Sequence, residues 1–503
     1  MRNALVIDGL DYWRRTTPEK AAVVMDGDVV AYAALGAWTD ATAVRLDRLG
    51  VGPGDVVAIA GANSLEWVVG ALAALKCGAA IAPFNTRFVR DELAHLVEVT
   101  EPKVVLADAP RAEILAQAAP GAAIVRMSEI SQDRGVAVSW TAPRVPPQAL
   151  ALIVFTSGTT GYPKGVMFDH EALLANYFER KVLEPRYDQD MRHLFTLPLH
   201  VGAGTIWGFL PATIHGGTFH LCSGLGIADT LSALVSLGIT HFEGPPVILD
   251  QIVQLPGFAE ANLSALKVAH VGGSRVSLAS LQAWWDKGVP LRQGYGMTEL
   301  GGFVTMTTDA EIAAQAETCG HGGPFSRMRV ARPDGSDCAA GEPGDVLLQG
   351  AAMMTGYWRN DEATAKAIVD GWIPSGDIGV YDALGNFKFV DRSKEMIISG
   401  GYNISPSEIE RVIIDLDLVR EVTVFPVPDA KFGETPAACV YADTAVDPKA
   451  IVAACCERLA DFKVPRYVIV LDQPIPRNDN GKADRKRLTR EYADAPARFP
   501  KLR

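Results

Sequence analysis

The chain has 503 residues, of which 48% are hydrophobic and 21% are charged. These proportions are typical of a globular protein with a sizeable core. At roughly 100–200 residues per domain, the length predicts more than one domain. The net charge of −12 argues against a nucleic-acid partner and against an anionic membrane surface.

The first part of the chain alternates helical and strand patterns. We expect helices at 39–49, 64–77 and 90–99, and strands at 56–60, 79–83 and 104–107. Such an alternation predicts layered α/β structure with parallel strand pairing.

The pattern changes twice further along the chain. Further α/β units are expected from His170 to about Gly302, and a β-rich section from about Gly320 to Val390. Beyond Asp391 we expect a small α/β domain, whose elements are a helix at 407–414, a strand at 419–427 and a helix at 448–461, followed by a basic, polar tail from Arg477.

Cysteines and histidines form no recognisable framework. The seven cysteines include no C-x-x-C pair, and the nine histidines lack a spacing such as H-E-x-x-H. We therefore expect no structural zinc site, and free, mostly buried thiols in a reducing compartment. The adjacent Cys455 and Cys456 are expected to be core thiols on a helix face.

No targeting or membrane segment is expected. The apolar run Ala4–Ile7 is too short for a signal peptide. The longest apolar stretches, about 68–83 and 194–211, contain Lys76 or His200 with several Gly and Pro residues, so neither resembles a span of about 20 apolar residues. We expect a cytoplasmic protein without a transmembrane segment.

A glycine- and hydroxyl-rich loop follows the apolar run Ala149–Phe155, which is expected to be a buried strand. The loop, residues 156–165, offers four Ser or Thr hydroxyls, three glycines and Lys164 within ten residues. Glycines let the backbone approach an anion closely, while N–H groups and hydroxyls donate to it. The loop is not a Walker A sequence, but its composition indicates a phosphate-binding loop.

Four further segments contain side chains suited to ligand binding or catalysis. The first sets an aromatic ring, a hydroxyl and a carboxylate among glycines, the second presents a carboxylate after a tight turn, and the last two carry lysines on polar stretches. They are Gln293–Glu299, Gly371–Asp377, Asp391–Glu395 with Ser399–Tyr402, and Pro476–Lys482.

The order of these five motifs resembles that of the acyl-AMP-forming superfamily, which includes acyl-CoA ligases, luciferases and peptide-synthetase adenylation domains. The resemblance covers nearly the whole chain. It implies an acyl-CoA synthetase-like α/β fold with layered sheets and a β-rich subdomain at 1–392, and a small mobile α+β lid domain at 393–503. It also implies three cofactors or cosubstrates, namely ATP, Mg²⁺ and coenzyme A.

The resemblance assigns most of the nucleotide-binding roles. Glu299 would hold Mg²⁺, and Thr298 would bond the α-phosphate of ATP. Tyr295 would stack on adenine between Gly294 and Gly296, and Asp377 and Arg392 would hold the ribose hydroxyls. The loop residues that would cradle the β- and γ-phosphates are Thr156, Ser157, Gly158, Thr159, Thr160, Gly161 and Lys164. The same set also includes Gly272, Gly273, Ser274 and Met297.

Two lysines would act in the two half-reactions. Lys482 would be the catalytic cation of adenylation, bridging the substrate carboxylate and the α-phosphate. Lys394 would be the hinge about which the lid rotates, and Gly400 and Gly401 would line the tunnel for the CoA thiol. This chain departs from the superfamily pattern at Pro374-Ser375, where Arg-Thr is more usual, which puts local phosphate or ribose contacts in doubt.

The acyl group should meet four segments, 197–207, 241–247, 272–274 and 294–302. Between Leu194 and Phe242 the only acid is Asp229, so no carboxylate is available to pair the ammonium of an amino-acid substrate. No Lys or Arg occurs between Arg192 and Lys267, although Arg275 leaves a dicarboxylate open. We expect a mostly apolar pocket with Trp207 as a wall.

Two residues in these segments keep alternative roles. His200 either borders the substrate carboxylate, as a catalytic residue, or is a satisfied, partly buried histidine. Glu243 either faces substrate or ends a strand.

The leading prediction is an ATP-dependent acid–CoA ligase for a hydrophobic monocarboxylate, whether aryl, alicyclic or medium-chain. One alternative is a stand-alone adenylating enzyme that loads a carrier protein. The other is a nucleotide-binding regulator without catalysis. Five retained residues argue against it, namely Lys164, Glu299, Asp377, Arg392 and Lys482. The expected partners are a small carboxylic acid and CoA, and a homodimer stays open.

Overall fold

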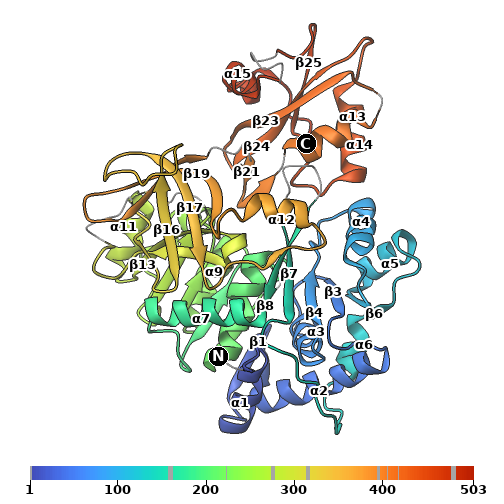
Figure 1. Cartoon of the computed structure of the whole chain (residues 1–503), viewed down its shortest axis with the longest axis vertical. Coiled ribbons are helices and arrows are strands. Elements are labelled where there is room, and N and C mark those ends of the chain that lie inside the picture. The colour runs from blue at the N-terminus through green and yellow to red at the C-terminus, as the bar shows by residue number, and fades with distance from the viewer. Residues whose placement is uncertain are drawn as a thin grey trace. The chain divides into compact units, whose positions relative to one another are not determined.

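The computed structural model describes residues 3–156, 163–222, 224–273, 278–312, 318–392, 397–404, 406–416, 418–476 and 483–503 (Figure 1). The chain forms two compact units. The first comprises Met1–Thr86, Val97–Phe155 and Gly165–Ser393, and the second comprises Arg87–Leu96, Thr156–Lys164 and Lys394–Arg503.

One sheet of the first unit has seven strands in the order β18-β8-β7-β4-β3-β5-β6. Its central strands pair in parallel, β3 with both β4 and β5, as the sequence predicts. Strands β3, β4 and β5 are buried along their whole length, which is usual for a parallel sheet covered on both faces. The strands are β3 (Val56–Ala60), β4 (Ala80–Pro83), β5 (Val104–Ala107), β6 (Ile124–Arg126), β7 (Leu150–Thr156), β8 (Lys164–Asp169) and β18 (Gly356–Tyr357).

Helix α3 (Leu65–Lys76) shows how sequence determines burial in this layer. Ser64 caps the helix by accepting a hydrogen bond from Trp67 N, and every residue except Glu66 is buried, because the helix is apolar on all sides. The buried ammonium of Lys76 is balanced by Asp11 at 2.9 Å and Asp40 at 2.5 Å. The other helices of this part are α1 (Asp8–Thr16), α2 (Tyr32–Arg48), α5 (Ala109–Ala118) and α6 (Met127–Gln132), whereas α4 (Arg90–Thr100) begins in the second unit and ends in the first.

The second sheet of this unit has nine strands in the order β15-β14-β13-β12-β11-β9-β10-β1-β2. Strands β10, β9, β11, β12 and β13, which are consecutive in this order, are parallel to one another, so their carboxyl ends meet at one edge. The strands are β1 (Ala21–Met25), β2 (Asp28–Ala31), β9 (Arg192–Phe195), β10 (Thr218–Leu221), β11 (His241–Glu243), β12 (Val268–Gly272), β13 (Leu291–Met297), β14 (Gly302–Met306) and β15 (His321–Gly322).

The connections of the second sheet are helical or tightly wound. They include a π-helix, η1 (Gly204–Phe209), and a short 3-10 helix, η3 (Thr298–Leu300). A second 3-10 helix, η2, spans Pro256–Phe258. The α-helices are α7 (His170–Leu183), α8 (Leu210–His215), α9 (Ile227–Ser236), α10 (Pro246–Val253) and α11 (Leu278–Asp286).

The β-rich section is an antiparallel sheet in the order β16-β17-β19-β20 (Figure 1). Its strands are β16 (Ser326–Ala331), β17 (Gly344–Gly350), β19 (Ile373–Tyr381) and β20 (Phe387–Arg392). The section also contains an unpredicted helix, α12 (Asp361–Ala367), which Asn360 caps by accepting a hydrogen bond from Ala363 N at 2.9 Å.

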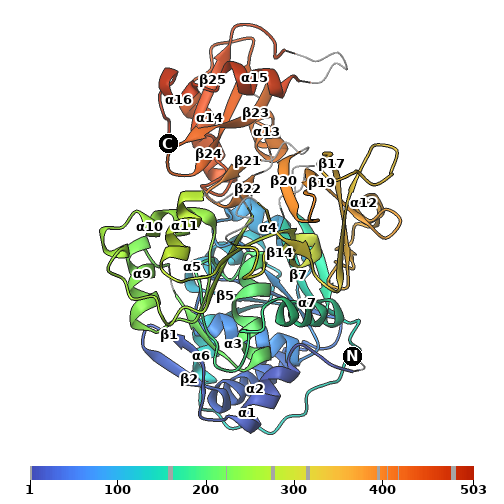
Figure 2. The ribbon, with the colours of Figure 1, turned by 90° about the vertical axis from the view of Figure 1, so that its left-hand side faces the viewer.

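The second unit contains a five-stranded sheet (Figure 2). Alternate residues of β24 face opposite sides of this sheet, as the period of a strand requires. Ala438 and Val440 pack with helices α13 and α14, whereas Ala437 and Cys439 pack with α15. The elements are β21 (Ile397–Ser399), β22 (Tyr402–Ile404), α13 (Pro406–Ile414), β23 (Glu421–Asp429), β24 (Gly433–Tyr441), α14 (Pro448–Arg458), β25 (Tyr467–Leu471), α15 (Arg485–Glu491) and α16 (Ala495–Arg498).

Three expectations concern helix α14, its two cysteines and membrane-spanning helices. The predicted helix at 448–461 forms as α14 with Cys455 in the core, but Cys456 is exposed, because neighbouring helical residues point in directions about 100° apart. The prediction that both are core thiols is therefore wrong for Cys456. Among the described residues, no helix is long and apolar enough to cross a membrane.

Candidate active site

The predicted site segments of the first unit follow the carboxyl ends of neighbouring parallel strands. Strand β9 ends at Phe195, β11 at Glu243 and β12 at Gly272, while β13 continues to Met297. Because these strands are adjacent in the sheet, segments far apart in sequence begin at the same edge. In open α/β sheets this edge is where ligands bind.

Close backbone packing explains the glycines of β13 and β12. A Cβ atom at Gly296 would lie 1.8 Å from the carbonyl oxygen of Gly302. A Cβ atom at Gly272 would lie 2.1 Å from the ring of Phe303, and one at Gly294 would lie 2.7 Å from the same ring. No side chain fits at these positions, so the turn from β13 to β14 requires glycine.

Tyr295 and Asp377 are bound to each other. The Tyr295 hydroxyl donates to Asp377 Oδ2 at 2.8 Å, and its ring packs against Phe387 with centroids 4.6 Å apart. The Ser375 hydroxyl donates to the Val346 carbonyl at 2.9 Å and accepts from Asp377 N at 3.1 Å. The unusual serine thus holds the backbone of Asp377, the residue that is predicted to bind ribose. Adenine stacking by Tyr295 stays a prediction.

Thr298 and Glu299 begin η3, directly after β13. The Glu299 carboxylate accepts a hydrogen bond from the Tyr357 hydroxyl at 2.8 Å, and its carbonyl accepts from Met354 N at 2.8 Å. Burial raises the pKa of Tyr357, which keeps the phenol protonated as a donor. No cluster of three or more His, Cys, Asp or Glu side chains in the described part of the chain could hold a metal ion.

Glu299 therefore supplies a single carboxylate. This fits Mg²⁺, which commonly binds one or two carboxylates together with substrate phosphates.

His200 is buried, with 7% of its surface exposed. Its loop lies against the start of η3, because a Cβ atom at Gly202 would be 3.6 Å from Thr298 Cγ2. The Thr205 hydroxyl donates to the carbonyl of Leu199 at 2.6 Å, which ties the loop to η1. His200 and Thr298 are thus on neighbouring segments.

The remaining predicted residues are placed as follows. Thr156 ends β7 and Lys164 begins β8, and the Thr156 hydroxyl donates to the Lys164 carbonyl at 3.5 Å. Met297 is partly buried opposite Gly302, and Gly273 has a left-handed backbone with φ +84°. The backbone of Arg392 pairs with Asp377. Ser157, Gly158, Thr159, Thr160, Gly161, Ser274, Lys394 and Lys482 lie outside the described residues.

Gly400 and Gly401 join two strands of the second unit. Ser399 pairs with Tyr402 across them, and both glycines have positive φ, +56° and +84°. A two-residue hairpin turn with positive φ at both positions explains the glycines. The contact of Gly400 and Gly401 with the CoA thiol stays a prediction.

Two aromatic side chains meet beside η3. Trp207 Nε1 donates to the Gly301 carbonyl at 2.6 Å, and a Cβ atom at Gly302 would lie 2.2 Å from the same nitrogen. Trp207 and Phe303 meet edge to face with centroids 4.8 Å apart. Trp207 is 3% exposed and packs in the main core of the first unit. Its role as a wall of the acyl pocket stays a prediction.

A buried polar cluster lies beside Trp207, and the sequence analysis missed its cation. Arg180 of α7 pairs with Glu243 at 2.7 Å, and its guanidinium carbon lies 3.0 Å from the Trp207 ring centroid. Tyr187 donates to Glu243, and His270 Nδ1 lies 3.5 Å from the same carboxylate. Glu243 is the last residue of β11, so the strand-end alternative is confirmed, and its carboxylate faces Arg180.

Arg180 lies outside the segments in which the sequence predicts acyl contacts. Asn176 and Arg180 share one helix face, and Asn176 Nδ2 donates to the Gly301 carbonyl at 3.3 Å. The relevance of Arg180 therefore depends on packing that the sequence does not display.

Burial and the Arg180 guanidinium shift the pKa of Glu243 in opposite directions. Burial alone pushes the pKa of Glu243 up, but the Arg180 guanidinium and the hydrogen bond with His270 outweigh it and lower this pKa below its ordinary value. Burial lowers the pKa of His193 to about 4. The cluster thus holds an ionised Glu243 beside a neutral His193 at neutral pH.

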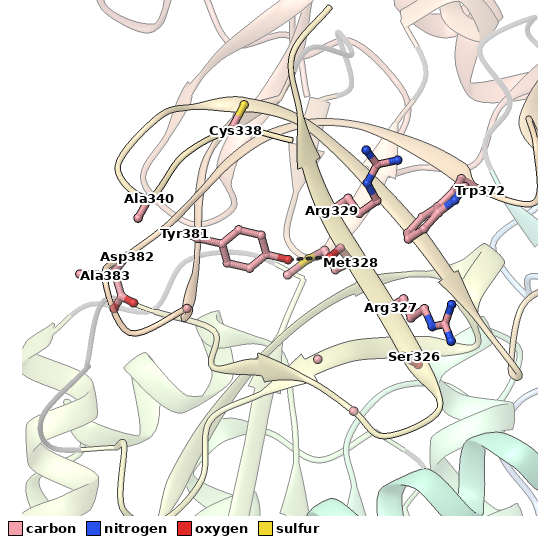
Figure 3. Close-up of a pocket in the computed structure, with 13 residues that line it drawn as sticks. Ser326, Arg327, Met328, Arg329, Cys338, Ala340, Trp372, Tyr381, Asp382 and Ala383 are labelled. Atoms are coloured by element: carbon pink, nitrogen blue, oxygen red, sulfur yellow. Dashed lines mark hydrogen bonds between the residues drawn. The ribbon is translucent and has the colours of Figure 1, made fainter. Parts of the chain in front are cut away.

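A separate surface hollow of about 760 Å³ lies on the β-rich section. Figure 3 shows Arg329 beside Trp372, and the Tyr381 hydroxyl donating to the Met328 carbonyl at 2.8 Å. None of the predicted site residues lines this hollow, so it is not the candidate active site.

The comparisons with known proteins agree across nearly the whole chain. The family model "AMP-binding enzyme" matches residues 10–358, and "AMP-binding enzyme C-terminal domain" matches residues 408–482. A feruloyl-CoA synthase from Amycolatopsis sp is 33% identical over 98% of this chain and 100% of its own length. A long-chain-fatty-acid–CoA ligase from Mycobacterium tuberculosis is 34% identical over 92% of this chain and 93% of its own.

A solved structure is similar as well. A double mutant of the o-succinylbenzoate CoA synthetase from Bacillus subtilis, bound with a product analogue, has a TM-score of 0.89 and 26% identity, and covers 97% of this chain and 98% of that one.

Gly296→Ala should destabilise the protein and weaken the site. The added methyl meets the Gly302 carbonyl at 1.8 Å, and overpacking of this kind costs about 1–3 kcal/mol. We expect a melting temperature several degrees lower and a clearly higher KM for ATP, measured by thermal denaturation and initial rates. Gly121→Ala is the control, since nothing lies within 4 Å of a Cβ atom there. Equal melting temperatures for the two variants would contradict the packing argument.

The stability of the protein should fall as pH is lowered from about 6.5 toward 4. The folded pKa of His193 is about 4, below the unfolded value near 6.5. The unfolded chain therefore binds more protons in this range, so stability rises with pH. The groups facing His193 are Glu243, Arg180, His270, His220 and His241.

Urea denaturation at several pH values measures the slope of unfolding free energy against pH. His193→Gln should flatten it. An unchanged slope in His193→Gln would show that this histidine is already protonated in the folded state.

Proposed function

The chain belongs to the AMP-binding enzyme family and is an acyl-CoA synthetase of the adenylate-forming type, and from this premise we propose that its acid is a hydrophobic monocarboxylate. The proposal covers aryl, alicyclic and medium-chain acids. The observation that carries it is the apolar pair of Trp207 and Phe303 beside Gly301 and Gly302. The names of the relatives, a feruloyl-CoA synthase and a fatty-acid–CoA ligase, are compatible with such acids.

The proposed reaction has two steps. A carboxylate oxygen of the acid attacks the α-phosphorus of ATP, the bond to the β-phosphate oxygen breaks, and pyrophosphate leaves. The CoA thiol then attacks the acyl carbon of the acyl-AMP, AMP leaves, and the thiol proton passes to solvent. In the first step charge spreads over phosphoryl oxygens, so the protein acts by positioning and neutralisation.

Each predicted residue has a place in this scheme. Asp377, held by Tyr295 and Ser375, would accept from the ribose hydroxyls together with Arg392. Thr298 would donate to the α-phosphate, with His200 beside the substrate carboxylate. The loop 156–164 would cradle the β- and γ-phosphates. Glu299 would hold Mg²⁺, which neutralises phosphate charge when bound.

The lid hypothesis assigns roles to Lys394 and Lys482, which both lie outside the described residues. We propose that residues 1–392 bind the nucleotide and that residues 393–503 form a lid hinged at Lys394. Lys482 would be delivered to the α-phosphate for adenylation and withdrawn for thiolation. Gly400 and Gly401 would then border the incoming thiol. The seven free cysteines support a reducing, cytoplasmic location, and a homodimer is one assembly to test.

An acid panel tests the substrate class. With aryl, alicyclic and medium-chain acids the protein should exchange labelled pyrophosphate into ATP and release AMP in the presence of CoA, whereas amino acids and dicarboxylates should give little product. Release of ADP would contradict the adenylate mechanism. AMP release that requires a carrier protein, and does not occur with CoA, would favour a stand-alone loading enzyme instead. Nucleotide binding without turnover of any acid would favour a regulator.

Lys482→Ala should separate the half-reactions. Loss of the cation should lower pyrophosphate exchange by roughly 100-fold or more while leaving conversion of supplied acyl-AMP to thioester nearly intact. Lys486→Ala, a nearby lysine of the same tail, is the control. Lys394→Pro should do the opposite, because a stiffened hinge impairs thioester formation more than adenylation. Equal losses of both steps in Lys482→Ala would refute the assigned role.

A further inference from the structure

Arg180 lies on the face of α7 that points to the predicted acyl segments. Asn176, one turn earlier on the same face, donates to the Gly301 carbonyl at 3.3 Å. The Arg180 guanidinium lies over the ring of Trp207, which in turn donates to that same carbonyl. Arg180 is therefore one side chain away from the backbone that follows Glu299.

Most of the hydrogen-bonding capacity of Arg180 is unused. Its Nη2 donates to the Tyr187 hydroxyl at 2.8 Å and to Glu243 Oε1 at 2.7 Å. Its Nε and Nη1 have no hydrogen-bond partner among the described residues, although Arg180 is only 4% exposed. A guanidinium stays protonated in proteins, and buried donors without acceptors are costly. These N–H groups are therefore poised to receive an acceptor.

The charge of Arg180 is already balanced. Glu243 pairs with it, and both side chains are nearly inaccessible. The other buried carboxylate nearby, Glu184, is paired with Arg292 at 3.0 Å and with Arg186 at 2.5 Å. Burial keeps His193 and His241 neutral by lowering the pKa of each. A second anion would therefore be buried without a free counter-charge.

We propose that Arg180 forms a subsite for a neutral oxygen acceptor, such as a hydroxyl, ether or ketone, at the end of the acid remote from its carboxylate. The inference rests on the proposed function and narrows it. The carboxylate end would lie near His200 and Thr298, and the apolar body of the acid against Trp207 and Phe303. The Trp207 ring covers the guanidinium, so this binding mode requires the ring to move aside, and Nε and Nη1 of Arg180 would then donate to the remote oxygen.

A matched series of acids tests this subsite. We would compare phenylpropanoic acids carrying hydroxyl, acetyl, methyl or carboxylate at the para position, and measure kcat/KM for AMP release with CoA. Methyl and hydroxyl groups are close in size, so their ratio isolates the hydrogen bond. We expect the hydroxyl and acetyl acids to exceed the methyl acid by roughly 10- to 100-fold, and the para-carboxylate to be the poorest substrate.

Variants assign the preference to Arg180. Arg180→Lys keeps the charge but loses the planar fork, and Arg180→Met combined with Glu243→Gln removes both charges so that neither is left unpaired. In each, the preference for hydroxyl over methyl should fall to within about threefold, mainly through KM. Arg292→Lys is the matched control, because it alters another buried arginine pair and should keep the preference. Circular dichroism and melting temperatures would verify folding.

The results with these acids and variants distinguish failure of the proposed function from failure of the Arg180 subsite alone. If none of these acids, nor any acid of the wider panel, releases AMP, the proposed function fails and this subsite with it. If acids are activated but hydroxyl, acetyl and methyl acids are used equally, the function stands and the subsite is refuted. A preference that survives in Arg180→Lys and in the double variant also refutes it. A para-carboxylate acid used best would show that the subsite binds an anion.

Discussion

The candidate site depends on one backbone contact, the approach of Gly296 to the carbonyl of Gly302. It forms because β13 returns through the short η3 into the antiparallel β14, with a register shift after Tyr295. A Cβ atom at Gly296 would lie 1.8 Å from that oxygen. The tight return leaves Tyr295 facing Asp377 on one side and η3 emerging on the other. Side chains that are consecutive in sequence can therefore address different parts of one ligand.

Around this turn, hydroxyl groups hold the carboxylates in place. Tyr357 binds Glu299, and Tyr295 and Ser375 constrain Asp377. Neutral donors orient a carboxylate without placing a cation beside it. Buried arginine partners would instead compete with the ligand for these oxygens. Glu243 differs from these two carboxylates, because it is paired with the buried cation of Arg180.

Much of the fold follows from local sequence, and less of it from distant contacts. The strands at 56–60 and 104–107 form as predicted, and α3 forms close to its predicted bounds, because a run of apolar residues between turns specifies both type and burial. The pairing of β1 with β10 was not predicted, since it joins residues nearly 200 positions apart. Helix α12 was missed because it is short and has no buried residues, so no apolar periodicity marks it.

The same distinction explains which parts of the site could be predicted. Glycines and hydroxyls of the turn regions are contiguous in sequence, so their chemistry is visible without a structure. Arg180 is not, because its relevance depends on α7 packing beside Gly301 and Trp207. The segments that follow the strands do not contain Arg180, so their charged residues alone do not reveal it. The helix that covers the same edge of the sheet contributes a cation from outside them, and specificity can therefore reside in a residue that no motif contains.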